Sequence, residues 1–170
     1  RHVGKVVLTT ARSQMRTALI TGGTGELGQA LPEHLVRTHG VRHLVLTSRR
    51  GSAPAEFVAR LHELGAQSVR IEACDVSVRE EVARVLPAEV DAVFHLAGVL
   101  DDGLLTGQTA ERLARVMAPK VLGAQHLHEL TSELDLSAFV LFSSVAGVFG
   151  GAGHGEEAPD QLQANPNNWR

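Results

Sequence analysis

Four short apolar runs constrain the fold of this chain more than any other feature of its sequence. They are TALIT, HLVLT, AVFHL and AFVLF, which cover residues 17–21, 43–47, 92–96 and 138–142. Apolar residues follow one another in these runs instead of alternating with polar ones, a pattern typical of strands buried on both faces of a parallel sheet. A weaker run, SVRIEA at residues 68–73, predicts a fifth strand.

Apolar residues at helical spacing lie between these runs and predict helices. Ser77 and Glu80 have the spacing of a capping box, which predicts that one helix starts there. Strands and helices therefore alternate, and right-handed crossovers between them give a doubly wound α/β sheet of five strands. The apolar stripes are Phe57, Val58, Leu61 and Leu64; Val78, Val82, Val85 and Leu86; Leu113, Val116 and Met117; and Gly123, Leu127 and Leu130.

Composition narrows the functions open to the chain. Hydrophobic residues make up 44% and charged residues 21%, so the chain can bury a core. The single cysteine, Cys74, excludes a disulfide framework, and the histidines have no ligand-like spacing, so we expect no bound metal. The net charge of −3 predicts neither a nucleic-acid nor an anionic membrane partner. No stretch is apolar enough to span a membrane and none resembles a signal peptide, so we expect a cytoplasmic protein.

A glycine-rich segment, TGGTGELG at residues 21–28, follows the first predicted strand and opens a helix. Its glycines allow a sharp turn and a close approach to a pyrophosphate, and the helix start offers free N–H groups to that anion. Because the strand–turn–helix context of a dinucleotide-binding loop is present, we favour this interpretation over a plain strand–helix turn. The cofactor-binding residues expected here are Thr21, Gly22, Gly23, Thr24, Gly25, Leu27 and Gly28.

The residues after the second predicted strand bear on the choice of cofactor. NAD-binding sheets usually carry an acid about 20 residues beyond the glycine loop, whereas this chain has Ser48, Arg49 and Arg50. A guanidinium binds a 2′-phosphate through charge-assisted hydrogen bonds, and a carboxylate would repel it. We therefore expect NADPH as the cofactor; the alternative is a loop with two solvated arginines.

Polar and small residues follow the other predicted strands. Asp75 comes after the third strand, Ala97 and Gly98 after the fourth, and Ser144 after the fifth. Ligands of open α/β sheets bind outside the carboxyl ends of the strands, so these residues belong to the candidate site. Asp75 has two interpretations, a partner of an adenine amino group or a cap or turn residue. His95, on an apolar strand, is expected to be a hydrogen-bonded core residue.

Six motifs occur in order along the chain: TGGTGELG, LTSRR, CDVS, HLAGVLDDG, APKVLGAQHLHEL and LFSSVAGVFG. In order and spacing they resemble the ketoreductase domain of modular polyketide synthases, a short-chain dehydrogenase/reductase, over residues 17–155. The resemblance implies a Rossmann-like doubly wound sheet of order 3-2-1-4-5 in residues 17–150, truncated at its C-terminal side. Residues 1–16 resemble a linker at the end of a preceding enoylreductase domain. Residues 151–170 are expected to form an irregular or disordered tail.

The resemblance also implies a reaction and its partners. The family uses NADPH to reduce a β-ketoacyl thioester, held on the phosphopantetheine arm of an acyl carrier protein, to a β-hydroxyacyl thioester. We therefore expect the acyl carrier protein and neighbouring synthase domains as partners. Carried over by position, Lys120 in APKVLG matches the family's catalytic lysine, and Ser144 in LFSSVAG matches its serine. Val76 in CDVS joins the expected cofactor-binding residues.

The family's catalytic tyrosine has no counterpart, because the chain contains no tyrosine. By position, Glu157 stands in place of the tyrosine and Gln161 in place of the family's asparagine. A glutamate has a pKa of about 4.3 against about 10 for tyrosine, so it is ionised near pH 7 and cannot donate a hydrogen bond to a ketone. We therefore expect the chain itself to be inactive. The alternative function is a non-catalytic nucleotide-binding or structural module of a synthase.

Two further features of the sequence bear on stereochemistry and on helix stability. Residues 100–102 (LDD) resemble the motif of B-type ketoreductases, and Phe149 stands where the opposite type has a tryptophan, so we expect B-type stereochemistry. The alternative for this motif is a solvated acidic turn. Pro32 falls in the helix after the glycine loop, where it would cost about 3 kcal/mol if it is truly internal.

Overall fold

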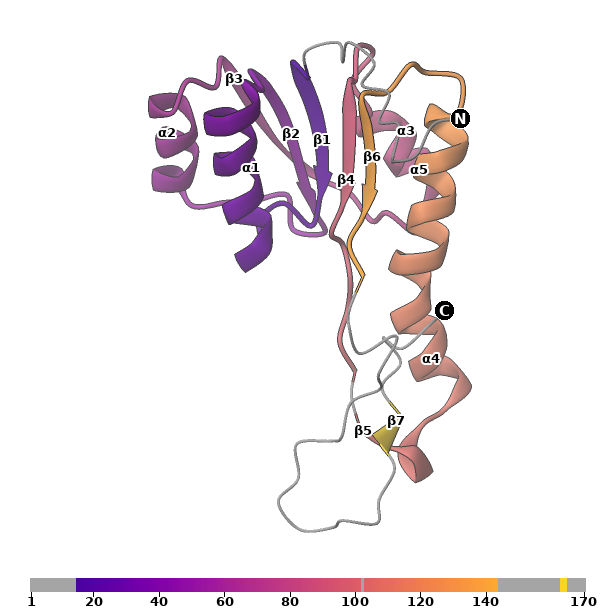
Figure 1. Ribbon diagram of the computed structural model, residues 1–170. Coiled ribbons are helices and arrows are strands. Elements are labelled where there is room, and N and C mark those ends of the chain that lie inside the picture. Colours follow the sequence, from indigo (N-terminus) through magenta and orange to yellow (C-terminus); the bar gives the residue numbers. More distant parts are fainter. Residues whose placement is uncertain (1–14, 102, 144–162, 165–170) are drawn as a thin grey trace, which may run out of the picture.

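Five parallel strands form the central sheet of the protein (Figure 1). They are β1 (Thr17–Thr21), β2 (His43–Ser48), β3 (Ser68–Ala73), β4 (Ala92–His95) and β6 (Ala138–Leu141). The computed structural model describes residues 15–101, 103–143 and 163–164. The strand order is β3-β2-β1-β4-β6, which confirms the predicted order 3-2-1-4-5.

The pairing register brings the carboxyl ends of the strands to one edge of the sheet. At the end of β1, Thr21 lies opposite Thr47 of β2 and His95 of β4, and Ser48 lies opposite Ala73 of β3. The loops that leave these strands therefore start side by side, although their residues are far apart in the sequence.

Helices cover both faces of the sheet, as the predicted crossovers require. In Figure 1, α1 and α2 lie on one side of the strands and α3 and α5 on the other. No helix within the described residues is both long enough and apolar enough to cross a membrane. The helices are α1 (Glu26–His39), α2 (Ala55–Glu63), α3 (Arg79–Val85), α4 (Ala110–Met117) and α5 (Gly123–Thr131), with a short 3-10 turn η1 (Leu105–Gly107) and a π-helical turn η2 (Ala118–Leu122).

The strand β1 shows why the apolar runs do not alternate. Ala18 and Ile20 pack into the cluster under α1 and α2, whereas Leu19 packs into the cluster under α3 and α5. All three side chains are fully buried. A strand in the middle of a two-faced sheet needs apolar side chains at every position, so the prediction of a doubly wound fold is confirmed.

A separate two-stranded ladder lies outside the main sheet. β5 (Gly103–Leu104) pairs antiparallel with β7 (Gln163–Ala164), with Gly103 opposite Ala164. β7 is the part of the predicted irregular tail that lies within the described residues.

The predicted capping box is wrong. Helix α3 begins at Arg79, and its cap residue Val78 makes no side-chain capping hydrogen bond. The Ser77 backbone N–H and hydroxyl both donate to Asp75 Oδ1, at 2.9 and 2.6 Å. Asp75 draws Ser77 into a turn before the helix starts, because a short acidic side chain competes for nearby N–H groups.

Pro32 is the seventh residue of α1 and lies in its interior, and the helix runs unbroken over 14 residues. The pyrrolidine ring removes the hydrogen bond that residue 32 would donate to the carbonyl of Gly28. The internal position therefore carries the full cost of about 3 kcal/mol for this helix. The buried ring, packed inside the domain, offsets part of that cost.

The start of α1 approaches the glycine turn too closely for any side chain. A Cβ atom on Gly28 would stand 2.2 Å from the Gly22 carbonyl oxygen and 2.7 Å from the carbonyl carbon of Gly23. Both neighbours are backbone atoms and cannot move aside without shifting the turn. A glycine at position 28 is therefore a packing requirement of this fold.

We predict that Gly28→Ala lowers the free energy of unfolding by about 1–3 kcal/mol or more, the range for overpacked sites. Gly25→Ala is the matched control in the same loop, because its Cβ would meet only the Gly22 oxygen, at 3.6 Å, and its φ is −78°. Urea unfolding followed by circular dichroism measures both variants. Equal stability of the two variants would contradict the close-packing argument.

Candidate functional site

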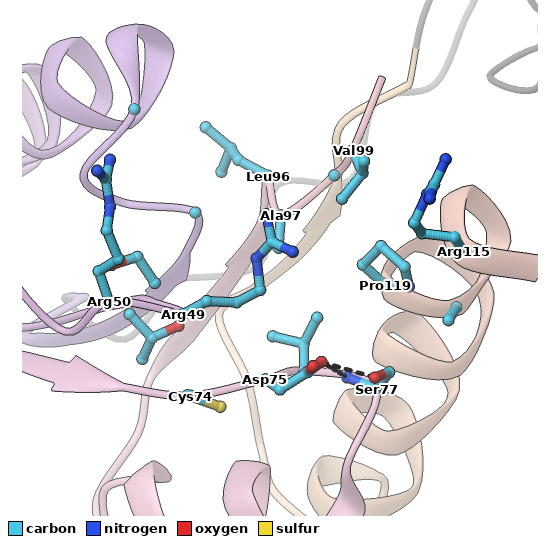
Figure 2. A pocket seen from close by; sticks show the side chains of 17 residues that line it. Arg49, Arg50, Cys74, Asp75, Ser77, Leu96, Ala97, Val99, Arg115 and Pro119 are labelled. Carbon is cyan, nitrogen blue, oxygen red and sulfur yellow. Dashed lines mark hydrogen bonds between the residues drawn. The ribbon is translucent and has the colours of Figure 1, made fainter. Parts of the chain in front are cut away.

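An open cleft of about 890 Å³ lies at the carboxyl edge of the sheet (Figure 2). The segments that follow β1, β2, β3 and β4 form its floor and sides, and the end of α4 and the start of η2 form one wall. It is lined by Gly22, Gly25, Thr47, Ser48, Arg49, Arg50, Cys74, Asp75, Val76, Ser77, Leu96, Ala97, Gly98, Val99, Arg115, Ala118 and Pro119.

The cleft brings together many of the residues singled out from the sequence. The expected cofactor-binding residues that line it are Gly22, Gly25, Ser48, Arg49, Arg50, Asp75, Val76, Ala97 and Gly98. Thr21, Gly23, Thr24, Leu27 and Gly28 belong to the adjoining turn and helix without lining the cleft. Ser144, Phe149, Glu157 and Gln161 lie outside the described residues.

The glycine turn builds one end of the cleft from backbone alone. Gly22 has φ +70°, and a Cβ atom there would stand 2.8 Å from the backbone nitrogen of Ala97. Gly25 occupies the position before α1 and makes no side-chain cap, so no capping side chain covers the first N–H groups of the helix. A turn without side chains next to a helix N-terminus fits a phosphate group.

Two arginines supply positive charge to the cleft. Arg49 and Arg50 leave the end of β2, and Figure 2 shows Arg49 extending into the cleft toward Ala97. No acid lines the cleft from β2 or the loop after it. The side chains present at this position therefore favour an anionic group over a neutral hydroxyl.

Of the two interpretations left open for Asp75, the structure shows the turn residue, and contact with an adenine amino group stays a prediction. Its Oδ1 accepts both Ser77 hydrogen bonds, so it is a turn residue, and it also lines the cleft. The Ser77 hydroxyl hydrogen bond, helped by the Ser77 N–H and the positive charge of Arg49, holds the pKa of Asp75 below its usual range. The carboxylate is therefore ionised and acts as an acceptor.

Sequence analysis missed Thr47. Its Oγ1 is buried without a hydrogen-bond partner, the one such side-chain atom found in the described part of the chain, and the residue lines the cleft. A buried hydroxyl without a partner is costly and marks a place where a ligand, water or small movement completes the bonding. Thr47 reads as an ordinary strand residue, and only its position at the cleft edge distinguishes it.

Lys120, in η2, does not line the cleft but lies next to Gly98, which does. A Cβ atom on Gly98 would stand 3.5 Å from Lys120 Cε, so the lysine stem passes directly over Gly98. Beneath it, His95 is buried, with its Nδ1 2.6 Å from Thr21 Oγ1 and its Nε2 3.0 Å from the Pro119 carbonyl oxygen. Burial lowers the pKa of His95, so the ring is neutral near pH 7. The prediction of a hydrogen-bonded core histidine is confirmed.

Asp101, in the LDD motif, is held by two arginines that sequence analysis also missed. Arg112 binds it through two nitrogens, with Nη2 2.6 Å from Oδ1 and Nε 3.2 Å from Oδ2, and Arg115 also binds Oδ2. Hydrogen bonds from Arg112 and Arg115 lower the pKa of Asp101 to about 2. Asp101 is therefore anchored to α4 and is not a freely solvated acid. Asp102 lies outside the described residues.

The described ranges hold no group of three or more His, Cys, Asp or Glu side chains arranged to bind a metal ion.

The strand order and the two layers of helices define the class of this protein, a Rossmann-like α/β domain with its cleft at the carboxyl edge of the sheet. The chain belongs to the KR domain family, which it matches over residues 16–159.

Curated relatives of the chain are modular polyketide synthases. It is 51% identical over 168 residues to the spectinabilin polyketide synthase system protein NorB of Streptomyces orinoci, with 93% of this chain and 8% of NorB covered. It is 57% identical over 150 residues to the polyketide synthase GfsA of Streptomyces halstedii, with 84% of this chain and 2% of GfsA covered. The chain thus spans less than a tenth of either relative.

Solved ketoreductases share the fold. An A1-type ketoreductase is 46% identical with a TM-score of 0.76, covering 84% of this chain and 32% of that one. A ketoreductase from the first module of phoslactomycin biosynthesis in Streptomyces sp. HK803 is 34% identical with a TM-score of 0.76, covering 94% of this chain and 36% of that one. The resemblance to polyketide synthase ketoreductases is therefore confirmed, for a chain about one third as long as these structures.

We predict that the single cysteine resists alkylation in the folded protein. Cys74 is buried beside the cleft, and burial, with Glu81 and Asp75 nearby, raises its thiol pKa from 9.0 to about 11. Because only the thiolate reacts, alkylation by iodoacetamide at pH 8 should be about 100-fold slower than in urea-unfolded chain. Mass spectrometry measures the rate, and equal rates in the two states would contradict the burial of Cys74.

Proposed function

We propose that the cleft binds NADPH and that the reaction of the parent protein is reduction of a β-ketoacyl thioester to a β-hydroxyacyl thioester. The observation that carries this proposal is that the glycine turn at Gly22–Gly25 lines one cleft with Arg49 and Arg50, and that no acid lines this cleft from β2 or the loop after it. The family membership supports the reaction class. When bound, NADPH would supply a hydride to the ketone carbon.

The chain offers distinct groups to the parts of the cofactor. The turn and the first N–H groups of α1 would hold the pyrophosphate, and Arg49, with Ser48 beside it, would hold the 2′-phosphate. The free acceptor capacity of the Asp75 carboxylate would meet the adenine amino group. Lys120, whose stem lies over Gly98, would act at the nicotinamide side together with Ser144.

We propose further that this chain reduces a β-ketoacyl thioester slowly or not at all. The reaction needs a proton donor for the developing alkoxide, and the chain has no tyrosine. Glu157, at the position of the tyrosine, carries an ionised carboxylate near pH 7, which repels an alkoxide and cannot donate to it. The alternative function, a non-catalytic nucleotide-binding or structural module of a synthase, is favoured by the same observation.

The stereochemical and partner assignments stay proposals. B-type stereochemistry is supported by the LDD motif, whose Asp101 is fixed to α4 by Arg112 and Arg115, because an anchored loop can present a constant face to a substrate. We propose an acyl carrier protein and neighbouring synthase domains as partners, and a cytoplasmic location, because the relatives are polyketide synthases.

We predict that Arg49→Gln weakens NADPH binding by about 10- to 100-fold, the loss of one charge-assisted contact of about 1.5–3 kcal/mol. Binding of NADH should change by less than about threefold, because NADH has no 2′-phosphate for Arg49 to contact. Arg60→Gln is the matched control, since Arg60 lies in α2, pairs with Glu33 and does not line the cleft. Nucleotide fluorescence titration measures all three chains, and an equal loss for both nucleotides would refute the phosphate role of Arg49.

We also predict that the purified chain binds NADPH yet oxidises it, with a small β-ketoacyl thioester, at well under about 1 per second, the low end of ordinary enzyme turnover. The measurement is the fall in absorbance of NADPH, with a solved ketoreductase of the same family as the positive control. Turnover at enzyme-like rates would overturn the argument from the missing tyrosine.

A further inference from the structure

His95 joins three parts of the domain that the chain does not connect locally. It ends β4, its Nδ1 meets Thr21 at the end of β1, and its Nε2 meets the carbonyl of Pro119 in η2. Lys120 is the next residue after Pro119 in that turn. We propose that His95 is a positioning residue that fixes η2 on the sheet and thereby holds Lys120 over Gly98; this rests on the proposed function only for the purpose that Lys120 serves.

The direction of each hydrogen bond follows from the chemistry of the partners. A carbonyl oxygen can only accept, so the Pro119 contact places the proton of the neutral ring on Nε2. Nδ1 must then accept from the Thr21 hydroxyl. The Thr21 oxygen in turn accepts from the Ala97 backbone N–H at 3.3 Å. A chain of three directed bonds runs from the cleft floor at Ala97 to the helical turn at Pro119.

The turn that receives this chain is irregular. Pro119 has no N–H to donate to the preceding helical turn, and the backbone widens to a π-helix over Ala118–Leu122, with the Gly123 N–H bonded to the carbonyls of Ala118 and Lys120. A widened turn is held less firmly by the regular backbone hydrogen bonds of the helix. A contact from outside the helix therefore has more effect on the position of the turn.

The ring and the turn are also in direct contact. A Cβ atom on Gly123 would stand 3.0 Å from His95 Cε1 and 2.9 Å from Val76 Cγ2, so the glycine lets the helix rest on the imidazole. His95 thus supports the start of α5, directly after η2, and donates to the Pro119 carbonyl within η2. The Pro119 carbonyl that the ring contacts belongs to the peptide unit that joins Pro119 to Lys120, so only this unit separates the ring from Lys120.

Two substitutions separate the two bonds of the ring. In His95→Gln the amide nitrogen reaches about as far as Nε2, so the donor to Pro119 is kept. In His95→Asn the amide stands near the Nδ1 position, so the bond to Thr21 is kept and the one to Pro119 is lost. Val93→Ala is a structural control, because Val93 is a fully buried residue of β4 that packs in the core cluster under α3 and α5.

The chain has only two lysines, Lys5 and Lys120, which allows a direct measurement of Lys120. In a Lys5→Arg background, reductive methylation with ¹³C-formaldehyde labels Lys120 and keeps its charge. We expect the ligand-free methyl signal to stay near its original position in His95→Gln and Val93→Ala, and to move in His95→Asn toward the shift of the urea-unfolded chain. An unmoved signal in His95→Asn, or equal movement in His95→Asn and His95→Gln, would overturn the proposal.

Two further measurements keep the test decisive. If His95→Asn does not fold, His95→Phe keeps a ring in the core but has no donor for the Pro119 carbonyl, and it should move the Lys120 signal in the same direction; an unchanged signal overturns the proposal. NADPH titration of the parent chain is read separately. Failure of NADPH to bind there would count against the proposed function, whereas the ligand-free Lys120 signal tests His95 alone.

Discussion

The close contact between the start of helix α1 and the glycine turn determines where the cleft of this protein can be. Gly28 and Gly22 meet backbone to backbone, with no room for a Cβ atom between them. This contact aims the N-terminus of a 14-residue helix at the edge where the five parallel strands end. The glycine turn can line the cleft with backbone because these two residues have no side chain, and the arginines after β2 line the same cleft.

Two polar networks hold α4 and η2, which contribute Arg115, Ala118 and Pro119 to the cleft. The neutral His95 ties β1 and β4 to η2, and the ionised Asp101 ties its loop to α4 through Arg112 and Arg115. The two networks differ in charge for a physical reason. The histidine is enclosed by carbonyl and hydroxyl groups, so burial keeps it uncharged, whereas the aspartate has two guanidinium partners that stabilise its charge.

The capping box and the two missed arginines show where patterns in the sequence lose their predictive power. Ser77 and Glu80 have the right spacing, but Asp75 two residues earlier offers a stronger local acceptor to Ser77. Arg112 and Arg115 look like solvated residues of an amphipathic helix until the fold brings Asp101 against them. In each case the competing partner, rather than the residue's own propensity, decides the role.

The sequence by itself determined the strands and the glycine turn, because burial on both faces and a glycine-rich turn leave direct marks on residue type, and the resemblance to a known family implied the strand order. It also singled out Arg49, Asp75 and Gly98, since strand ends in a doubly wound sheet share one edge. The tertiary structure alone decided that Thr47 lines the cleft, that Asp101 is clamped to α4 and that His95 reaches Pro119. These contacts join segments distant in the chain, and no local pattern encodes a partner that only the packing of strands and helices brings within hydrogen-bond distance.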